Sequence, residues 1–144
     1  DDFFIPGSLI GIDVDTDDPV TYGMQPEAAA FFVRSSAFET VGLSGYGEGG
    51  REERVRAPEP DVKMVVTYAE DDLLLSGWAL GEDQHLAGKG AAARVGLGDG
   101  EVVLLGFRTQ FRGQSRGTFK LLFNALQGAA RGPARRPITE EPEG

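Results

Sequence analysis

The clearest hydrophobic pattern is a pair of apolar segments that meet at a glycine-rich turn. Residues 91–97 and 101–107 are rich in alanine, valine and leucine, and the sequence Gly98-Asp99-Gly100 joins them. Glycine readily adopts the positive φ angles that a tight turn requires, so this pattern predicts a β-hairpin.

A helical pattern follows the hairpin. Apolar side chains recur at the i, i+3, i+4 and i+7 spacing, at Phe119, Leu122, Phe123 and Leu126. This spacing predicts an amphipathic helix, with Thr118 in the N-cap position and Gly128 ending the last turn.

Three earlier segments have strand character. Residues 8–14 alternate between polar and apolar positions, which predicts a half-buried strand with its isoleucines and Val14 facing inward. The apolar segment 28–34 is predicted to be a buried strand, although its three alanines leave a helix as the alternative. Residues 62–68 are rich in β-branched side chains and favour a further strand.

These segments together predict an α+β fold, with a mixed, largely antiparallel sheet of about five or six short strands and one strong C-terminal helix. Residues 1–128 are expected to form a single domain, in which the glycine- and charge-rich segment 44–61 is a long flexible loop. The proline-rich segment 129–144 is expected to be a disordered tail or linker. The core is predicted to contain Ile10, Ile12, Val14, Phe31, Val33, Val65, Leu74, Val103, Leu105, Phe107, Phe119, Leu122 and Phe123.

The charge of the chain argues against several classes of partner. The formal net charge is −9 at pH 7, whereas nucleic-acid binding needs a basic surface. The same charge disfavours an anionic membrane surface, and no apolar segment approaches the ~20 residues of a membrane-spanning helix. The chain has no cysteine, which excludes disulfides, thiolate metal sites and cysteine nucleophiles but does not identify the compartment.

An aspartate-rich turn at residues 13–18 is the first candidate site. Asp13, Asp15 and Asp17 place carboxylates at alternate positions, which suits a hard cation such as calcium. The segment lacks the glycine and the bidentate glutamate of an EF-hand loop, since Asp18 and Met24 occupy those positions. We therefore predict a turn whose carboxylates cap their own backbone, without a metal or other cofactor.

A second candidate is a glycine-containing segment in which Arg108, Arg112 and Arg116 are four residues apart. Arginine forms bidentate bonds to anions, and the following helix N-terminus also attracts negative charge, so this segment could bind an anion. The alternative is that these arginines pair with carboxylates of the chain and hold the loop in place. Trp78, the only tryptophan, could stack on a sugar, or it could be a core or interdomain contact.

The sequence offers only weak catalytic candidates. His85 is the only histidine and lies in the polar segment 81–90, whereas hydrolytic zinc sites generally use two or three imidazoles. Ser76 lacks the Gly-x-Ser-x-Gly context of an esterase nucleophile. A Ser-His-Asp triad through His85 is not excluded by the sequence, but no motif supports it.

Two stretches carry a family resemblance. One is PGSLIGIDVDTDDPVTYGMQPEAAAFFVRSSAFE, and the other comprises LLLSGWALGE and GKGAAARVGLGDGEVVLLGFRTQFRGQSRGTFKLLFNAL, with GFRTQFRGQ at residues 106–114 as the best marker. Over about residues 6–126, the chain resembles the extreme C-terminal region of large bacterial zinc carboxypeptidase-like proteins. In those proteins a metallopeptidase domain precedes a domain similar to class I glutamine amidotransferases.

This resemblance implies an accessory domain and gives no catalytic residues. The peptidase's zinc-binding His-x-x-Glu pair has no counterpart, because Leu-Ala-Gly follows His85, and the amidotransferase nucleophile is a cysteine, which this chain lacks. The resemblance also implies an exported or periplasmic location and only the later part of an amidotransferase-like domain. Its exposed sheet edge would then be covered by other domains of a parent protein or by self-association.

Three functions follow from these observations. The leading hypothesis is a non-catalytic accessory or interaction domain of a larger exported zinc carboxypeptidase-like protein. One alternative is a small-ligand module that binds an anion or a sugar through Trp78 and the loop from Arg108 to Arg116. The other is a divergent hydrolase built around Ser76 or His85, which requires His85 within hydrogen-bond reach of a hydroxyl and a carboxylate.

Overall fold

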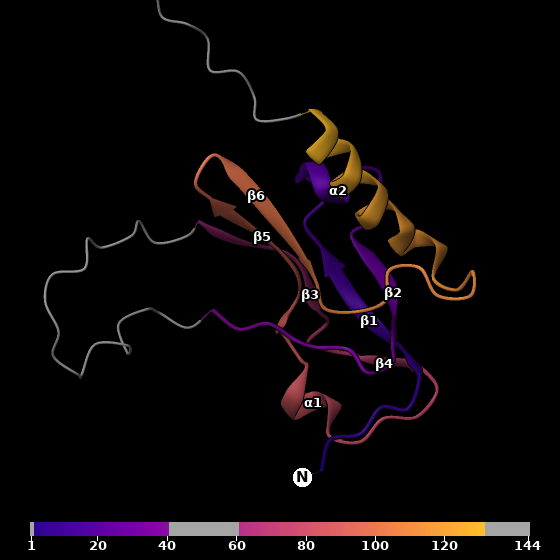
Figure 1. Cartoon of the computed structure of the whole chain (residues 1–144). Coiled ribbons are helices and arrows are strands. Elements are labelled where there is room, and N and C mark those ends of the chain that lie inside the picture. Colours follow the sequence, from indigo (N-terminus) through magenta and orange to yellow (C-terminus); the bar gives the residue numbers. More distant parts are fainter. Residues whose placement is uncertain (1, 41–60, 132–144) are drawn as a thin grey trace, which may run out of the picture.

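The computed structural model describes residues 2–40 and 61–131, without the side chains of residues 130 and 131. Figure 1 shows how these residues are arranged around one curled sheet. The loop predicted at 44–61 lies outside the described residues except for Asp61, and so does the predicted tail beyond Arg131.

A six-stranded sheet forms the centre of the described fold, with the order β2-β1-β3-β5-β6 and with β4 paired to β1 outside this path. Every strand pairing is antiparallel. The strands are β1 (Ser8–Val14), β2 (Glu27–Phe32), β3 (Val62–Tyr68), β4 (Leu74–Ser76), β5 (Gly90–Leu97) and β6 (Gly100–Leu105). The predicted strands and the predicted hairpin are present, and the α+β fold class is confirmed.

The main helix, α2 (Phe119–Arg131), packs against the short 3-10 helix η1 (Pro19–Thr21) at one end of the sheet (Figure 1). Two side chains of α2 fix this contact. The Asn124 amide donates to the carbonyl oxygens of Val20 at 2.9 Å and Tyr22 at 3.0 Å, and the Lys120 ammonium donates to the Gly23 carbonyl. These bonds to the backbone of residues 20–23 add to the apolar contact of the buried Leu121 in joining the helix to the domain.

The helix begins directly after Thr118, as predicted, but the predicted capping bond and the predicted C-terminal end are wrong. A second 3-10 helix, η3 (Arg116–Thr118), leads into α2. The Thr118 hydroxyl donates backward to the carbonyls of Thr109 and Ser115, at 2.8 and 2.7 Å, and is not an N-cap acceptor. At the other end, α2 continues past Gly128 to Arg131, because glycine weakens a helix without obliging it to stop. The first three residues of the predicted tail are therefore helical.

A short helix, α1 (Glu82–His85), occupies part of the segment that was predicted to be a polar loop. Its two acidic residues, Glu82 and Asp83, lie in the first turn. Negative charge at that position is favourable because the N-terminal end of a helix carries a partial positive charge. A helix of only four residues is too short to leave a recognisable pattern in the sequence, so it could not be predicted.

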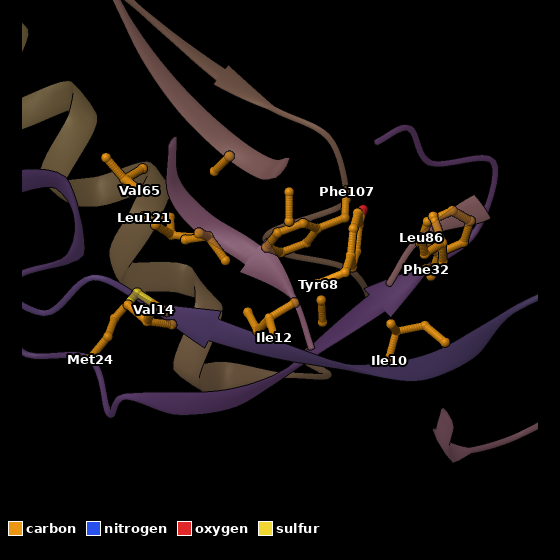
Figure 2. Packing of buried hydrophobic residues seen from close by; sticks show 14 of the residues in the cluster. Ile10, Ile12, Val14, Met24, Phe32, Val65, Tyr68, Leu86, Phe107 and Leu121 are labelled. Atoms are coloured by element: carbon orange, nitrogen blue, oxygen red, sulfur yellow. The ribbon is translucent and has the colours of Figure 1, made fainter. Parts of the chain in front are cut away.

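The core lies between the sheet and the elements that cover it (Figure 2). Ile10, Ile12 and Val14 of β1 are buried as predicted, and so are Val65 and Phe107. Tyr68 is fully buried, and its hydroxyl donates to the Ser36 carbonyl at 2.9 Å. Buried hydrophobic residues outside the predicted core list include Ile5, Val20, Met24, Ala30, Val66, Leu86 and Ala91.

At several predicted core positions, a neighbouring residue is buried instead of the predicted one. In β2, Phe32 is buried and Phe31 only half-buried; near β4, Leu73 is buried and Leu74 is exposed. A shift of one residue along a strand moves a side chain to the opposite face of the sheet. In α2, Leu121 is fully buried whereas Phe123 is 57% exposed. The remaining predicted positions, Val33, Val103, Leu105, Phe119 and Leu122, are half-buried.

Candidate anion-binding surface

The loop after β6 is held against the edge strand β2. The backbone of Arg108 forms an isolated antiparallel bridge with Phe31. The chain then turns sharply, and the Gln114 N–H donates to the Phe111 carbonyl at 2.9 Å. Arg112 has a φ of +52°, which places it in the left-handed region. This conformation is uncommon for a non-glycine residue, and here it lets Arg108 and Arg112 lie beside the same ring.

Two phenylalanine rings form a platform for these arginines. Phe31 and Phe111 stack with their ring centroids 4.9 Å apart and an angle of 7° between the planes. The guanidinium carbon of Arg108 lies 5.1 Å from the Phe111 centroid, and that of Arg112 lies 6.0 Å from it. Cations at this distance are attracted by the ring quadrupole. We call these four residues the arginine–phenylalanine surface.

In the described part of the chain, Arg108 and Arg112 contact an aromatic ring and not a carboxylate. The ion pairs within the described part of the chain involve Lys63, Lys89 and Arg94. None of those ion pairs includes Arg108, Arg112 or Arg116, all of which are exposed. The alternative in which carboxylates pin the loop therefore has no support in residues 2–40 and 61–131. Within the same residues, the guanidinium donors of Arg108 and Arg112 are not used by a carboxylate.

The positive charges around these arginines are separated from the acidic residues along the sequence. Residues 102–131 contain no aspartate or glutamate, and their cationic residues are Arg108, Arg112, Arg116, Lys120 and Arg131. This segment carries +5, so the rest of the chain carries −9 − 5 = −14. The net charge of the whole chain does not show that positive and negative residues are separated in this way. Counting the charges segment by segment does.

Trp78 lies in a different contact group. Its ring packs beside Phe4, with centroids 5.9 Å apart and an angle of 60°. The Ser8 hydroxyl accepts a hydrogen bond from the Trp78 N–H at 3.0 Å and donates to the Trp78 carbonyl at 2.6 Å. Trp78 is 54% exposed, so it is not a core residue. Within the described residues it has no ring contact or hydrogen bond with Arg108, Arg112 or Arg116, and a ligand-binding role for Trp78 stays a prediction.

The aspartate-rich turn caps its own backbone, as the sequence predicted. Asp15 accepts the Asp17 N–H at 3.1 Å and forms an ion pair with Lys63 at 2.8 Å, while Asp13 and Asp17 are exposed. Among the described residues, no group of three or more histidine, cysteine, aspartate or glutamate side chains is arranged to hold a metal ion. Of the three weak metal candidates, Asp15 is the one whose carboxylate caps the turn and pairs with Lys63.

Asp18 is the member of this turn whose importance the sequence did not reveal. Its side chain is 1% exposed and pairs with Arg94 at 2.7 Å and Lys63 at 3.2 Å. It also accepts the Val20 N–H at 3.0 Å, which caps η1. Burial raises the pKa of Asp18, but the bonds from Val20, Arg94 and Lys63 outweigh burial and hold its pKa below the ordinary value. The Asp-Pro dipeptide, a helix-start pattern, was the available sequence signal.

The hydrolase candidates are not assembled into a catalytic group. The His85 ring packs against Phe3, with centroids 5.0 Å apart, and lines a cavity of about 420 Å³ together with Lys89 and Glu39. Within residues 2–40 and 61–131, the His85 imidazole makes no hydrogen bond with a hydroxyl or a carboxylate. Ser76 lies exposed in β4. The geometry that a Ser-His-Asp hydrolase requires is therefore not found in this part of the chain.

Comparisons with protein-family models, with curated proteins and with solved structures found no match to this chain. The likeness to zinc carboxypeptidase-like proteins thus stays a prediction from the sequence segments quoted above. Among the described helices, none combines the length and the apolar composition needed to cross a membrane.

Proposed function

We propose that this chain is a non-catalytic interaction domain that binds an acidic segment of a partner protein through the arginine–phenylalanine surface. One observation carries the proposal: Arg108 and Arg112 lie exposed over the Phe111 ring, without a carboxylate partner among the described residues. Arginine offers a planar set of donors that matches a carboxylate. Aromatic residues and arginine are also enriched at protein interfaces.

The shape of this surface favours a polypeptide over a small free anion. Small-molecule sites are usually concave and enclose most of the ligand. The two described cavities, of about 420 and 410 Å³, are lined by other residues, whereas Arg108 and Arg112 lie open on the protein surface. An extended acidic segment could contact both guanidinium groups without being enclosed.

The charge of the remaining chain favours a short acidic segment over nucleic acid. A long polyanion would extend from the +5 segment onto a chain that otherwise carries −14, and like charges would oppose it. A short carboxylate-rich peptide needs only the local basic surface. The resemblance to zinc carboxypeptidase-like proteins supports the same class of function, because it implies an accessory domain that contacts other protein domains.

The proposal is tested by the fluorescence anisotropy of a fluorescein-labelled hexaglutamate peptide at low salt. Arg108→Gln and Arg112→Gln are each expected to weaken binding about fivefold, since an exposed ion pair contributes up to ~1 kcal/mol. Phe111→Leu should also weaken binding, because it removes the platform without changing the charge. Added salt should lower the affinity of the wild type by screening.

Lys89→Gln is the matched control. Lys89 pairs with the exposed Glu39 at 2.8 Å, so the variant removes one positive charge outside the arginine–phenylalanine surface. It should bind the peptide like the wild type. Equal losses in Lys89→Gln and Arg112→Gln would refute a specific site. Tighter binding of inorganic phosphate than of the peptide would favour the small-anion alternative, and tighter binding of labelled oligothymidylate would show that nucleic acid is the ligand.

A further inference from the structure

The outer edge of β6 has no strand partner among the described residues, since β6 pairs only with β5. The opposite edge strand, β2, is partly covered by the bridge between Phe31 and Arg108. Natural proteins protect free edges with proline, lysine or β-bulges. The β6 sequence GEVVLL contains neither proline nor lysine, and its register with β5 has no shift. This edge therefore lacks the usual features that prevent pairing.

The hairpin geometry identifies the backbone groups that face outward. Leu97 and Gly100 flank the turn made by Gly98 and Asp99. In such a hairpin the flanking pair is hydrogen-bonded and the following pairs alternate. The bond from the Gly106 N–H to the Ala91 carbonyl, at 2.9 Å, fits this alternation. The N–H and C=O groups of Glu101, Val103 and Leu105 are therefore directed away from β5.

We propose that β6 binds β6 of a second copy of this chain in antiparallel register, with Val103 opposite the same residue of its partner. Pairing about a two-fold axis satisfies the outward N–H and C=O groups of both strands at once. It also places Val102 opposite the partner's Leu104. These side chains are 42% and 39% exposed in the single chain, and they meet in the closely spaced type of antiparallel pair.

The charges of β6 are compatible with this symmetric arrangement. Glu101 is the only charged residue in the strand. The side chain of Arg94 holds its carboxylate through a bond of 2.8 Å from Nε and a second bond from the guanidinium. In the proposed register Glu101 lies opposite the partner's Leu105, so the two glutamates do not face each other. Like charges directly opposite would destabilise the pair.

Sedimentation equilibrium of the full chain tests this inference. The wild type should reach twice the chain mass of 15.4 kDa as its concentration rises. Val103→Pro should remain at the single-chain mass, because its outward N–H is not used by β5 and proline is tolerated at such edge positions. Leu104→Lys provides a second test that leaves the backbone unchanged, and it should also remain at the single-chain mass.

Leu126→Lys is the matched control, because Leu126 is a 59% exposed leucine on α2 and not on the hairpin. It should dimerise like the wild type. A wild type that stays at the single-chain mass up to about 1 mM would overturn the proposal. So would dissociation of the dimer by Leu126→Lys but not by Leu104→Lys, since the contact would then lie on α2.

Discussion

Asp18 provides the sharpest test of how the sheet, η1 and the charged side chains are connected. The change Asp18→Asn keeps the shape of the side chain and keeps an oxygen that can accept the Val20 N–H. It removes the negative charge that binds Arg94 and Lys63. The variant therefore separates the capping role of Asp18 from its role as a buried counter-ion.

The expected loss in the free energy of unfolding is about 2 kcal/mol at pH 7, within the range for hydrogen bonds to charged groups. Breaking a buried ion pair costs ~3–5 kcal/mol when the remaining charge is left buried and unpaired. Here neither cation is left alone: Arg94 keeps Glu101, and Lys63 keeps Asp15 at 2.8 Å. The side chains of Arg94 and Lys63 are also 28% and 50% exposed, so water can reach them.

Urea unfolding followed by circular dichroism, at several pH values, measures this loss. The pKa of Asp18 is lowered in the folded state, so its contribution is present above the unfolded pKa of about 4. The contribution disappears as the pH falls through the lower folded-state pKa. The difference between wild type and Asp18→Asn should therefore shrink in acid. Asp17→Asn, at an exposed position, is the control and should change stability by less than ~0.5 kcal/mol. A loss for Asp18→Asn as small as this, or one independent of pH, would refute the reasoning.

Two further substitution pairs test the packing by urea unfolding. Leu121→Ala should lower the free energy of unfolding by about 3 kcal/mol because Leu121 is fully buried. Phe123→Ala, at a 57% exposed position, should lower it by less than ~1 kcal/mol. The reverse order would mean that the buried face of α2 is assigned incorrectly. Gly106→Ala should lose about 3 kcal/mol, since the added Cβ would lie 2.5 Å from the Ser36 carbonyl oxygen and 2.9 Å from that of Ala91. Gly117→Ala is its control, because a Cβ there meets no atom within 4 Å. If both glycine variants lost the same free energy of unfolding, the backbone would not pass as close to Gly106 as the structure shows.

The strands could be predicted because their hydrophobic patterns and turn residues agree. Residues 8–14 and 62–68 match β1 and β3, and the hairpin forms at its predicted turn. The buried face of a segment was harder to predict where both faces are apolar. Phe31 and Phe32 are adjacent aromatics, and only pairing with β1 decides that Phe32 faces inward. Local patterns cannot resolve such a choice, because tertiary contacts make it.

The candidate surface was only partly predictable for a related reason. The spacing of Arg108 and Arg112 predicted that they could bind one anion together. Their shared ring, Phe111, depends on a left-handed residue and on the Phe31 bridge, which the spacing does not show. Asp18 gave a similar result: its role as a cap follows from the Asp-Pro sequence, whereas Arg94 is 76 residues away in the chain. Contacts over such separations are set by the sheet order, which no local motif contains.

The sheet order also relates the two proposed surfaces. Arg108 is bridged to Phe31 in β2, which is one edge of the main path, and β6 is the other edge. The proposed contact spans Glu101–Leu105 of β6 and includes no residue of the arginine–phenylalanine surface, so each dimer would carry two such surfaces. Two such surfaces on one particle make the second binding event intramolecular when a partner presents two acidic segments. A partner that presents two acidic segments should then bind the wild type more tightly than it binds Leu104→Lys, although a single hexaglutamate peptide should bind both proteins equally. Equal affinity of the two proteins for the two-segment partner would show that the surfaces act separately.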